Sequence, residues 1–395
     1  MNLEGKNQKG MRLENLMRTL RILVFQGTCS RRDLAQQLGL SKMSITNIIN
    51  TFLSNGLVVE VESQEVKHST SGPKPVLLKV AAGKLVAIGI HITEYFINGQ
   101  LYDAEEGVIC EKKVLIDNIS SKTQFMNHIK EIVDQLVECA KSKNIRIAAI
   151  GITDNYFINR EEGSVVFKGN QLGIDDNYLR SNLKQRYGLP VILEHERMGL
   201  LLTEMAYGLY NHSKKYYFLA ISNEIRGDFT NGYNIQKGCV GLSGMVGHMS
   251  IKCDGPRCSC GNRGCYEQYG SIEALLKDSN CSSIKEFNKN LGNREPSALR
   301  ALESFIQVTT LAITNIVNLY DPEAVVITGS ILELDSSVLK KIEYLVNNSF
   351  VFRKQRSITI IPSQMREKDF NKGAAILAFY EMAADKDYIN YLCGL

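Results

Sequence analysis

One short cysteine-rich stretch constrains this 395-residue chain more than any other feature. From His248 to Glu267 it reads HMSIKCDGPRCSCGNRGCYE, so four of the ten cysteines lie in a loop of Gly, Pro, Arg and Asn. Three of these cysteines have the spacing C-x-C-x4-C, and a histidine stands ten residues before the first of them. Such a cluster in a polar loop is not typical of core cysteines, although ordinary buried thiols or a disulfide pair are the alternatives.

Thiolate sulfur and imidazole nitrogen are ligands that zinc prefers, and one histidine with three cysteines can complete a tetrahedral shell. Gly261 and Gly264 stand where the loop must turn back on itself, because glycine adopts backbone angles that other residues avoid. The spacing therefore predicts a bound Zn²⁺, with Cys253 as a fifth candidate ligand. The predicted ligands are His248, Cys258, Cys260 and Cys265.

The same stretch resembles the signature of the ROK family, whose name stands for repressors, open reading frames and sugar kinases. The pattern H-x9-C-x-C-G-x-x-G-C-x-E runs from His248 to Glu267. In that family the histidine and the three cysteines bind zinc, while the histidine and the final glutamate face a sugar. The resemblance implies a two-lobed α/β fold of the actin-like, ribonuclease-H-like type, with His248 and Glu267 as candidate effector contacts.

The positive charge of the chain is concentrated at its N-terminus. Residues 1–82 hold 11 Lys or Arg against 6 Asp or Glu, a net charge of +5, whereas the remainder carries a net charge of −1. A small basic module ahead of a nearly neutral domain favours a partner that is a polyanion. We therefore predict two domains, residues 1–82 and residues 83–395.

Three helices with a tight turn are predicted in the first domain. Residues 13–25 have apolar side chains at steps of three and four, and Ser30 with Asp33 resembles a capping box for a second helix. A third helix is expected from Lys42 to Asn55, and two strand-like runs follow within residues 57–80. This order predicts a winged helix-turn-helix, which is similar to the N-terminal domain of ROK repressors. Its buried residues would be Ile45, Ile48, Ile49 and Phe52.

The outward face of the third helix carries small polar side chains that suit base edges in a DNA major groove. Basic residues before it would contact the DNA backbone, and Lys74 in the wing loop would contact the backbone or the minor groove, with a solvated loop as the alternative. A helical hairpin that binds another protein is the alternative. The predicted DNA contacts are Arg31, Arg32, Lys42, Met43, Ser44, Thr46, Asn47 and Lys74.

From Lys84 onward, strands and helices alternate, as expected for an α/β domain. The exceptions are an irregular segment expected from the end of IAAIGIT to Leu189 and a hairpin expected between residues 216–222 and 233–241. Residues 371–383 are expected to form the closing helix.

A kinase of this fold needs glycine-rich turns, whose N–H groups approach the phosphates, and a carboxylate that takes a proton from the sugar. Where the family has roughly D-x-G-G-T and G-T-G-I-G, this chain has HITEY at 91–95 and SNEIR at 222–226. Neither run can cradle phosphate, and each adds a glutamate that would repel ATP. The catalytic stretch E-N-D-x-N becomes EHERM at 194–198, which leaves Glu196 as either a candidate effector contact or an acidic residue at a helix start.

We therefore expect a DNA-binding transcriptional regulator, a repressor of carbohydrate-related genes, whose kinase-derived domain serves dimerisation and effector sensing without catalysis. The expected partners are a double-stranded DNA operator, a second copy of the chain in a homodimer, and a sugar or other small-molecule effector; a tetramer stays open. The alternatives are a ROK sugar kinase with an N-terminal extension and a module that binds another protein. Because no apolar run approaches the ~20 residues of a bilayer span and no cleavable leader precedes the cysteines, a cytoplasmic protein is expected.

Overall fold

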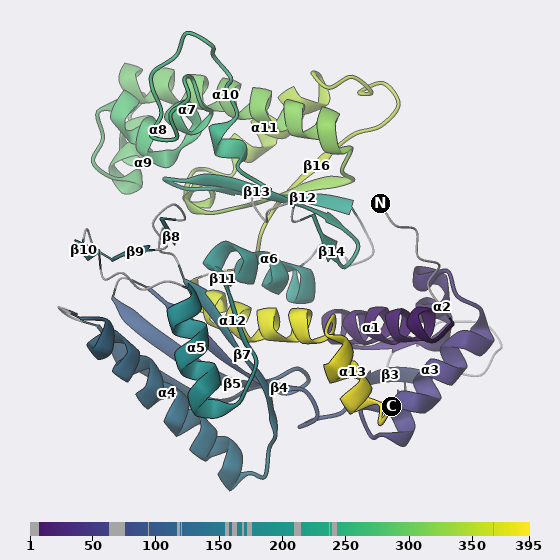
Figure 1. Ribbon diagram of the computed structural model, residues 1–395. Coiled ribbons are helices and arrows are strands. Elements are labelled where there is room, and N and C mark those ends of the chain that lie inside the picture. Colours follow the sequence, from purple (N-terminus) through teal and green to yellow (C-terminus); the bar gives the residue numbers. More distant parts are fainter. Residues whose placement is uncertain are drawn as a thin grey trace. The chain divides into compact units, whose positions relative to one another are not determined.

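The computed structural model describes residues 8–62, 76–93, 95–116, 119, 121–154, 158–159, 164–167, 170–171, 176–208, 215–236, 238, 243–365 and 367–395. Two compact units make up the chain (Figure 1). The first unit is Met1–Tyr207 together with Met365–Leu395, and the second unit is Gly208–Gln364. Among the helices in these described ranges, none is both long enough and apolar enough to cross a lipid bilayer.

The first unit begins with the three predicted helices, α1 (Gln8–Gln26), α2 (Arg31–Leu38) and α3 (Lys42–Ser54). Ser30 and Asp33 form the expected capping box at the start of α2, which ends at Gly39 in the left-handed conformation. The four predicted core residues of α3 are buried. An antiparallel sheet of order β1-β3-β2 completes this N-terminal module, with strands β1 (Cys29–Ser30), β2 (Val58–Glu62) and β3 (Val76–Val80).

A five-stranded sheet of order β11-β7-β4-β5-β6 forms the first lobe. Its strands are β4 (Val86–Ile92), β5 (Phe96–Asp103), β6 (Gly107–Leu115), β7 (Ile147–Asp154) and β11 (Val191–His195). Figure 1 shows α4 and α5 over one face of this sheet, and α6 and α12 over the other. These helices are α4 (Lys122–Ser142), α5 (Asp176–Tyr187), α6 (Glu196–Tyr207) and α12 (Glu367–Met382).

The prediction of an irregular segment before Leu189 is wrong in part, because this segment contains the helix α5. This helix buries Leu179 and Leu183, one turn apart, against the core of the first lobe. Most of its other side chains are polar, so its apolar periodicity is too weak to read from the sequence. Three short strands also lie in this segment: β8 (Ile158–Asn159), β9 (Ser164–Phe167) and β10 (Asn170–Gln171).

The second unit repeats the topology of the first lobe. Its sheet has the order β14-β13-β12-β15-β16, so in both sheets the first three strands along the chain are antiparallel and the last two are parallel to the first. The strands are β12 (Lys215–Ile221), β13 (Ile225–Asn231), β14 (Asn234–Ile235), β15 (Ala324–Thr328) and β16 (Thr359–Pro362). The helices are α7 (Glu267–Gly270), α8 (Ile272–Ser279), α9 (Ile284–Gly292), α10 (Pro296–Tyr320) and α11 (Ser337–Asn347), with 3-10 turns η1 (Val246–His248) and η2 (Ser330–Glu333).

The predicted hairpin partner of β12 is also wrong. Residues 225–231 pair with β12 in place of the predicted partner, and within the described part of 233–241 the residues Asn234–Ile235 pair with β13. The turn between β12 and β13 is tighter than expected, and β13 carries charged side chains such as Arg226 and Asp228 between its apolar ones. One-sided burial of a strand allows such alternation.

The last helices of the chain attach the N-terminal module to the first lobe. The predicted closing helix corresponds to α12, and a further short helix that was not predicted, α13 (Lys386–Leu392), follows it. The ring of Tyr380 at the end of α12 lies 4.3 Å from the Arg21 guanidinium and packs edge-on against Phe25, both in α1. The Asn55 amide at the end of α3 donates to the Cys393 carbonyl over 3.1 Å.

The backbone of α12 lies so close to the first sheet that side chains are excluded where the two meet. A Cβ atom on Gly151 in β7 would stand 1.8 Å from the Ala374 carbonyl oxygen. We therefore predict that Gly151→Ala destabilises the protein by about 1–3 kcal/mol through overpacking. Gly292→Ala, at an open position on α9, is the matched control and should be neutral or slightly stabilising. Urea unfolding of both variants tests this, and equal midpoints would contradict the close packing.

Candidate metal centre and phosphate-turn positions

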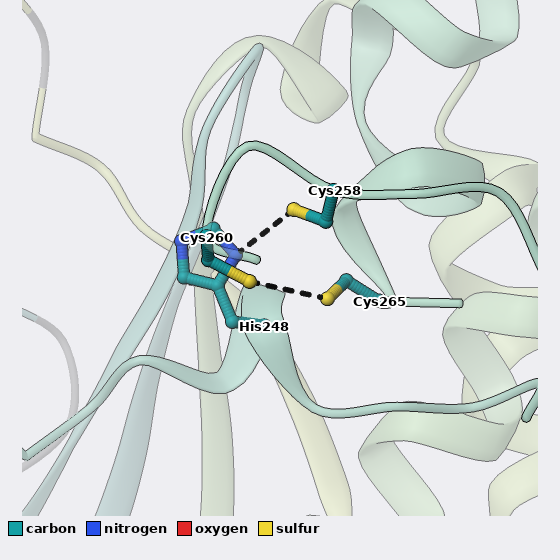
Figure 2. Close-up of side chains that lie close together, drawn as sticks. All are labelled: His248, Cys258, Cys260 and Cys265. Carbon is teal, nitrogen blue, oxygen red and sulfur yellow. Dashed lines mark hydrogen bonds between the residues drawn. The ribbon is translucent and has the colours of Figure 1, made fainter. Parts of the chain in front are cut away.

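The predicted zinc ligands lie together in the second unit (Figure 2). His248 ends η1, and the three cysteines follow in the loop before α7. The His248 Nδ1 atom lies 3.6 Å from Cys258 Sγ, and Cys260 Sγ lies 3.6 Å from Cys265 Sγ. All four candidate ligand atoms lie within 4.8 Å of one another.

Glycine makes the loop compact enough to bring these side chains together. Gly264 has a φ of 63°, and a Cβ atom there would stand 1.6 Å from the Lys252 carbonyl oxygen. The Gly264 carbonyl accepts the backbone N–H of Ile251 over 2.8 Å, and Ser250 forms a bridge with Cys265. The loop therefore folds back on its own entry, which carries Cys265 to the histidine side.

The geometry fits a tetrahedral metal ion. Zinc–sulfur bonds of about 2.3 Å place two sulfur ligands roughly 3.8 Å apart at the corners of a tetrahedron. The separation of 3.6 Å between Cys260 Sγ and Cys265 Sγ agrees with this edge length. Cys253, the fifth candidate, is exposed and is not part of the cluster of four.

The thiol chemistry of the cluster also fits a cation. Burial raises the pKa of Cys258, but hydrogen bonds from Cys260, Cys265 and His248 outweigh it and lower that pKa to about 7. Burial and the neighbouring thiols raise the pKa of Cys265 to about 12. One thiolate can thus form among the thiols, whereas further ionisation requires a positive charge between them. Gln268, which sequence reasoning did not select, donates to Cys258 Sγ over 3.8 Å and supports the same anion.

Glu267 takes a structural hydrogen bond next to this centre. Its Oε2 atom accepts the backbone N–H of Ile225 at the start of β13 over 2.8 Å. A Cβ atom on Gly247 would stand 3.0 Å from the same oxygen. Glu267 therefore ties the end of the cysteine loop to the sheet, in addition to its predicted role as an effector contact.

The backbone N–H groups of the first phosphate-turn position are occupied by the chain's own hydroxyl. Thr93 Oγ1 accepts from the N–H groups of Tyr95 and Phe96 over 3.2 and 3.0 Å, and donates to the Phe96 carbonyl. A phosphate would need such N–H groups to point at it. The predicted repulsive residue here, Glu94, lies outside the described residues.

At the second phosphate-turn position, the N–H of Ser222 bonds the Glu224 carbonyl and the N–H of Ile225 bonds Glu267. Ser222 Oγ accepts the N–H of Ser330 over 3.0 Å, just after β15, and the Ser222 carbonyl accepts from Ile272. The other predicted glutamate, Glu224, lies 3.9 Å from Arg226 within the turn. Sequence reasoning found the missing glycines but had no signal for these hydroxyl contacts.

Glu196 lies at the first turn of α6 and near a buried histidine. Its Oε2 atom is 3.8 Å from the Nε2 atom of His91, and the His91 Nδ1 atom is 3.2 Å from Thr153 Oγ1. The His91 ring stacks on Phe370, and burial lowers its pKa to about 4. A neutral imidazole therefore occupies the place of the family's first-turn aspartate.

The predicted DNA-contact residues of α3 lie on its solvent side. Met43 is 69% exposed and Asn47 is exposed, whereas Ser44 and Thr46 are half-buried. The Thr46 hydroxyl donates to the Lys42 carbonyl, and the Ser44 hydroxyl shares a hydrogen bond with the N-cap Ser41. No such bond within the described chain involves the Asn47 amide, so it is the side chain best able to bond a base edge.

The predicted backbone contacts differ in their surroundings. Arg32 is exposed, whereas Arg31 pairs with Glu60 of β2 at 2.7 Å. This partly exposed pair contributes at most about 1 kcal/mol, so Arg31 can exchange its partner for a phosphate. Lys74 lies outside the described residues.

Comparison with known proteins agrees with this geometry. The xylose repressor of Bacillus subtilis (strain 168) is 27% identical over 343 residues, which cover 85% of this chain and 87% of the relative. A solved ROK family transcriptional regulator, a homologue of the E. coli MLC protein, covers 97% of this chain and 99% of its own, with a TM-score of 0.72 and 20% identity. The ROK hexokinase from Thermus thermophilus covers 76% of this chain and 100% of its own, with a TM-score of 0.66 and 19% identity.

The two solved structures share the two-lobed α/β architecture, which confirms the predicted ROK actin-like fold. The family model for the ROK family matches residues 87–381, about three quarters of the sequence. The chain therefore belongs to the ROK family.

Proposed function

We propose that the chain is a DNA-binding transcriptional repressor of carbohydrate-related genes. The carrying observation is the exposed polar face of α3, whose opposite face is buried in a basic module of helices and a small antiparallel sheet. Residues 1–82 carry a net charge of +5, as expected for a module that binds DNA phosphates. The repressor name of the Bacillus subtilis relative, which matches along 85% of this chain, supports the same function and a sugar as the effector.

The ROK domain of such a repressor would sense rather than phosphorylate. At both phosphate-turn positions the hydroxyls of Thr93 and Ser222 take up nearby N–H groups, which leaves no glycine-rich cradle there. Its effector contacts would include Glu196 in the first unit, and His248 and Glu267 in the second. Two copies would form a homodimer that presents two α3 helices to an operator with two half-sites.

A sugar kinase with an N-terminal extension is the second candidate. The ROK hexokinase likeness and the carboxylate of Glu196 favour it. The two candidates differ in their need for ATP, so one assay separates them.

We predict that DNA binding resides in residues 1–82 and weakens with salt, with a slope of about −0.9 per neutralised phosphate. Replacing Ser44 and Asn47 together by Ala should relax sequence preference by roughly 1–3 kcal/mol for each base that these side chains no longer bond. Arg32→Ala should weaken binding to every DNA sequence alike. Competition binding to specific and random duplexes measures both effects.

Ser54→Ala is the matched control for this experiment, because Ser54 is exposed at the far end of α3, away from the residues that read bases. It should leave sequence preference unchanged. If the double variant at 44 and 47 discriminates as well as the wild type, α3 is not the recognition helix.

We predict no ATP-dependent phosphorylation of common hexoses or their N-acetylamines above the level of a Glu196→Gln variant. The reason is that the N–H groups of Tyr95 and Phe96 already bond Thr93, and that neither turn position has a glycine-rich run. A coupled ADP-release assay makes the comparison. Turnover by the wild type that Glu196→Gln abolishes would establish the kinase instead.

We predict about one zinc per chain, held by the cluster of one histidine and three cysteines. The Cys258→Ser, Cys260→Ser variant should lose nearly all of it, and Cys253→Ser should keep it because Cys253 stands outside the cluster. Acid or chelator should release the metal, since thiolate ligands must stay deprotonated. Elemental analysis of protein purified without chelator gives the stoichiometry. If the double variant contains as much zinc per chain as the wild type, these cysteines are not the ligands.

A further inference from the structure

A cavity of about 390 Å³ lies within the first unit, where the N-terminal module, the first lobe and α13 meet. We call it the junction cavity. Its polar lining comes from four separate parts of the chain, and its volume is within the ~300–1,000 Å³ range of small-molecule sites. The polar residues that line it are Asn55, Lys84, Asn144, Arg146, Tyr388 and Tyr391.

The charge of the junction cavity is positive. Lys84 and Arg146 both line it, and the described lining includes no Asp or Glu. In the described part of the chain, neither cation forms an ion pair. Both side chains are exposed at the mouth of the cavity, and the Arg146 guanidinium lies 3.9 Å from the centroid of the Tyr391 ring.

Lys84 and Arg146 are not needed as hydrogen-bond donors to the carbonyl oxygens at the ends of the neighbouring helices. The Asn55 amide already donates to the Thr51 carbonyl at the end of α3 over 2.8 Å, and to the Cys393 carbonyl after α13 over 3.1 Å. At the end of α4, the Asn144 N–H bonds the Lys141 carbonyl, and backbone bonds close the last turn of α13 in the same way. The positive charge of the cavity is therefore available to a ligand.

We propose that the junction cavity binds a small dianion, a phosphate monoester or a dicarboxylate, between Lys84 and Arg146. Paired cations and neutral donors are the groups that recognise such an ion. The phenol of Tyr388 supplies a neutral donor, because burial raises its pKa to about 12 despite the nearby Arg146. The site lies wholly within the first unit and shares no residue with the predicted effector contacts.

Occupancy of this site would act on α3. Asn55 caps that helix, lines the cavity and bonds the chain end after α13, so a ligand there fixes α3 against α13. If α3 binds DNA as proposed above, the dianion alters operator affinity. This second consequence rests on the proposed function, whereas dianion binding itself does not.

Calorimetric titration of the full-length protein with inorganic phosphate, and separately with malonate, tests the site at constant ionic strength. We expect saturable binding of at least one of them, weakened about tenfold or more by Lys84→Met and by Arg146→Met, and partly retained by Arg146→Lys. Lys143→Met is the matched control, because Lys143 is an exposed cation beside Asn144 that does not line the cavity. Unchanged thermal unfolding in chloride shows that each variant is folded.

Phosphate alone, malonate alone or both binding in this pattern supports the site and identifies the anion that it prefers. Binding that does not saturate, or that Lys143→Met weakens as much as Lys84→Met, would overturn it as a general effect of surface charge. A titration in which neither anion binds the folded wild type would overturn it too. Operator binding with and without phosphate is measured separately, so loss of DNA binding leaves the titration interpretable.

Discussion

The close approach of α12 to the first sheet is the constraint on which the rest of the first unit depends. At Gly151 no side chain separates strand from helix, so the position of α12 is fixed by backbone packing. The same helix ends at Tyr380, whose ring holds α1 through Arg21 and Phe25. The N-terminal module is therefore attached to the lobe by the end of the chain as well as by the segment that follows β3. The helix α12 therefore contacts both the first sheet and the N-terminal module.

This arrangement explains how a kinase fold can serve a regulator. Phosphate transfer needs N–H groups that are unbonded until the nucleotide arrives, whereas here Thr93 uses them within its own turn. In the second unit, Ser222 Oγ accepts the N–H of Ser330, which follows β15. In such turns the backbone N–H groups form hydrogen bonds within the protein, where a kinase would use them to bind a nucleotide. The fold keeps two lobes and a cysteine loop, while the glycine-rich runs of the kinases are replaced at both turn positions.

The sequence predicted much of this fold because its signals were local. Apolar periodicity identified α1 and α3, the capping pair Ser30 and Asp33 placed the start of α2, and the cysteine spacing predicted the four ligands that lie together. The failures have a physical cause as well. The helix α5 has only a short apolar face, around Leu179 and Leu183, and β13 alternates charged and buried residues, so their partners across the fold decide their structure. The junction cavity could not be predicted at all, because its residues come from segments more than 300 positions apart.

The central claim is that this ROK protein acts on DNA. Immunoprecipitation of the full-length protein from its own cells, followed by sequencing of the bound DNA, tests it most directly. We predict a small set of sites that share one inverted repeat, lie upstream of genes for carbohydrate use, and disappear when Ser44 and Asn47 are replaced by Ala. Enrichment no greater than that of an untagged control, or sites that persist unchanged in the variant, would contradict the account.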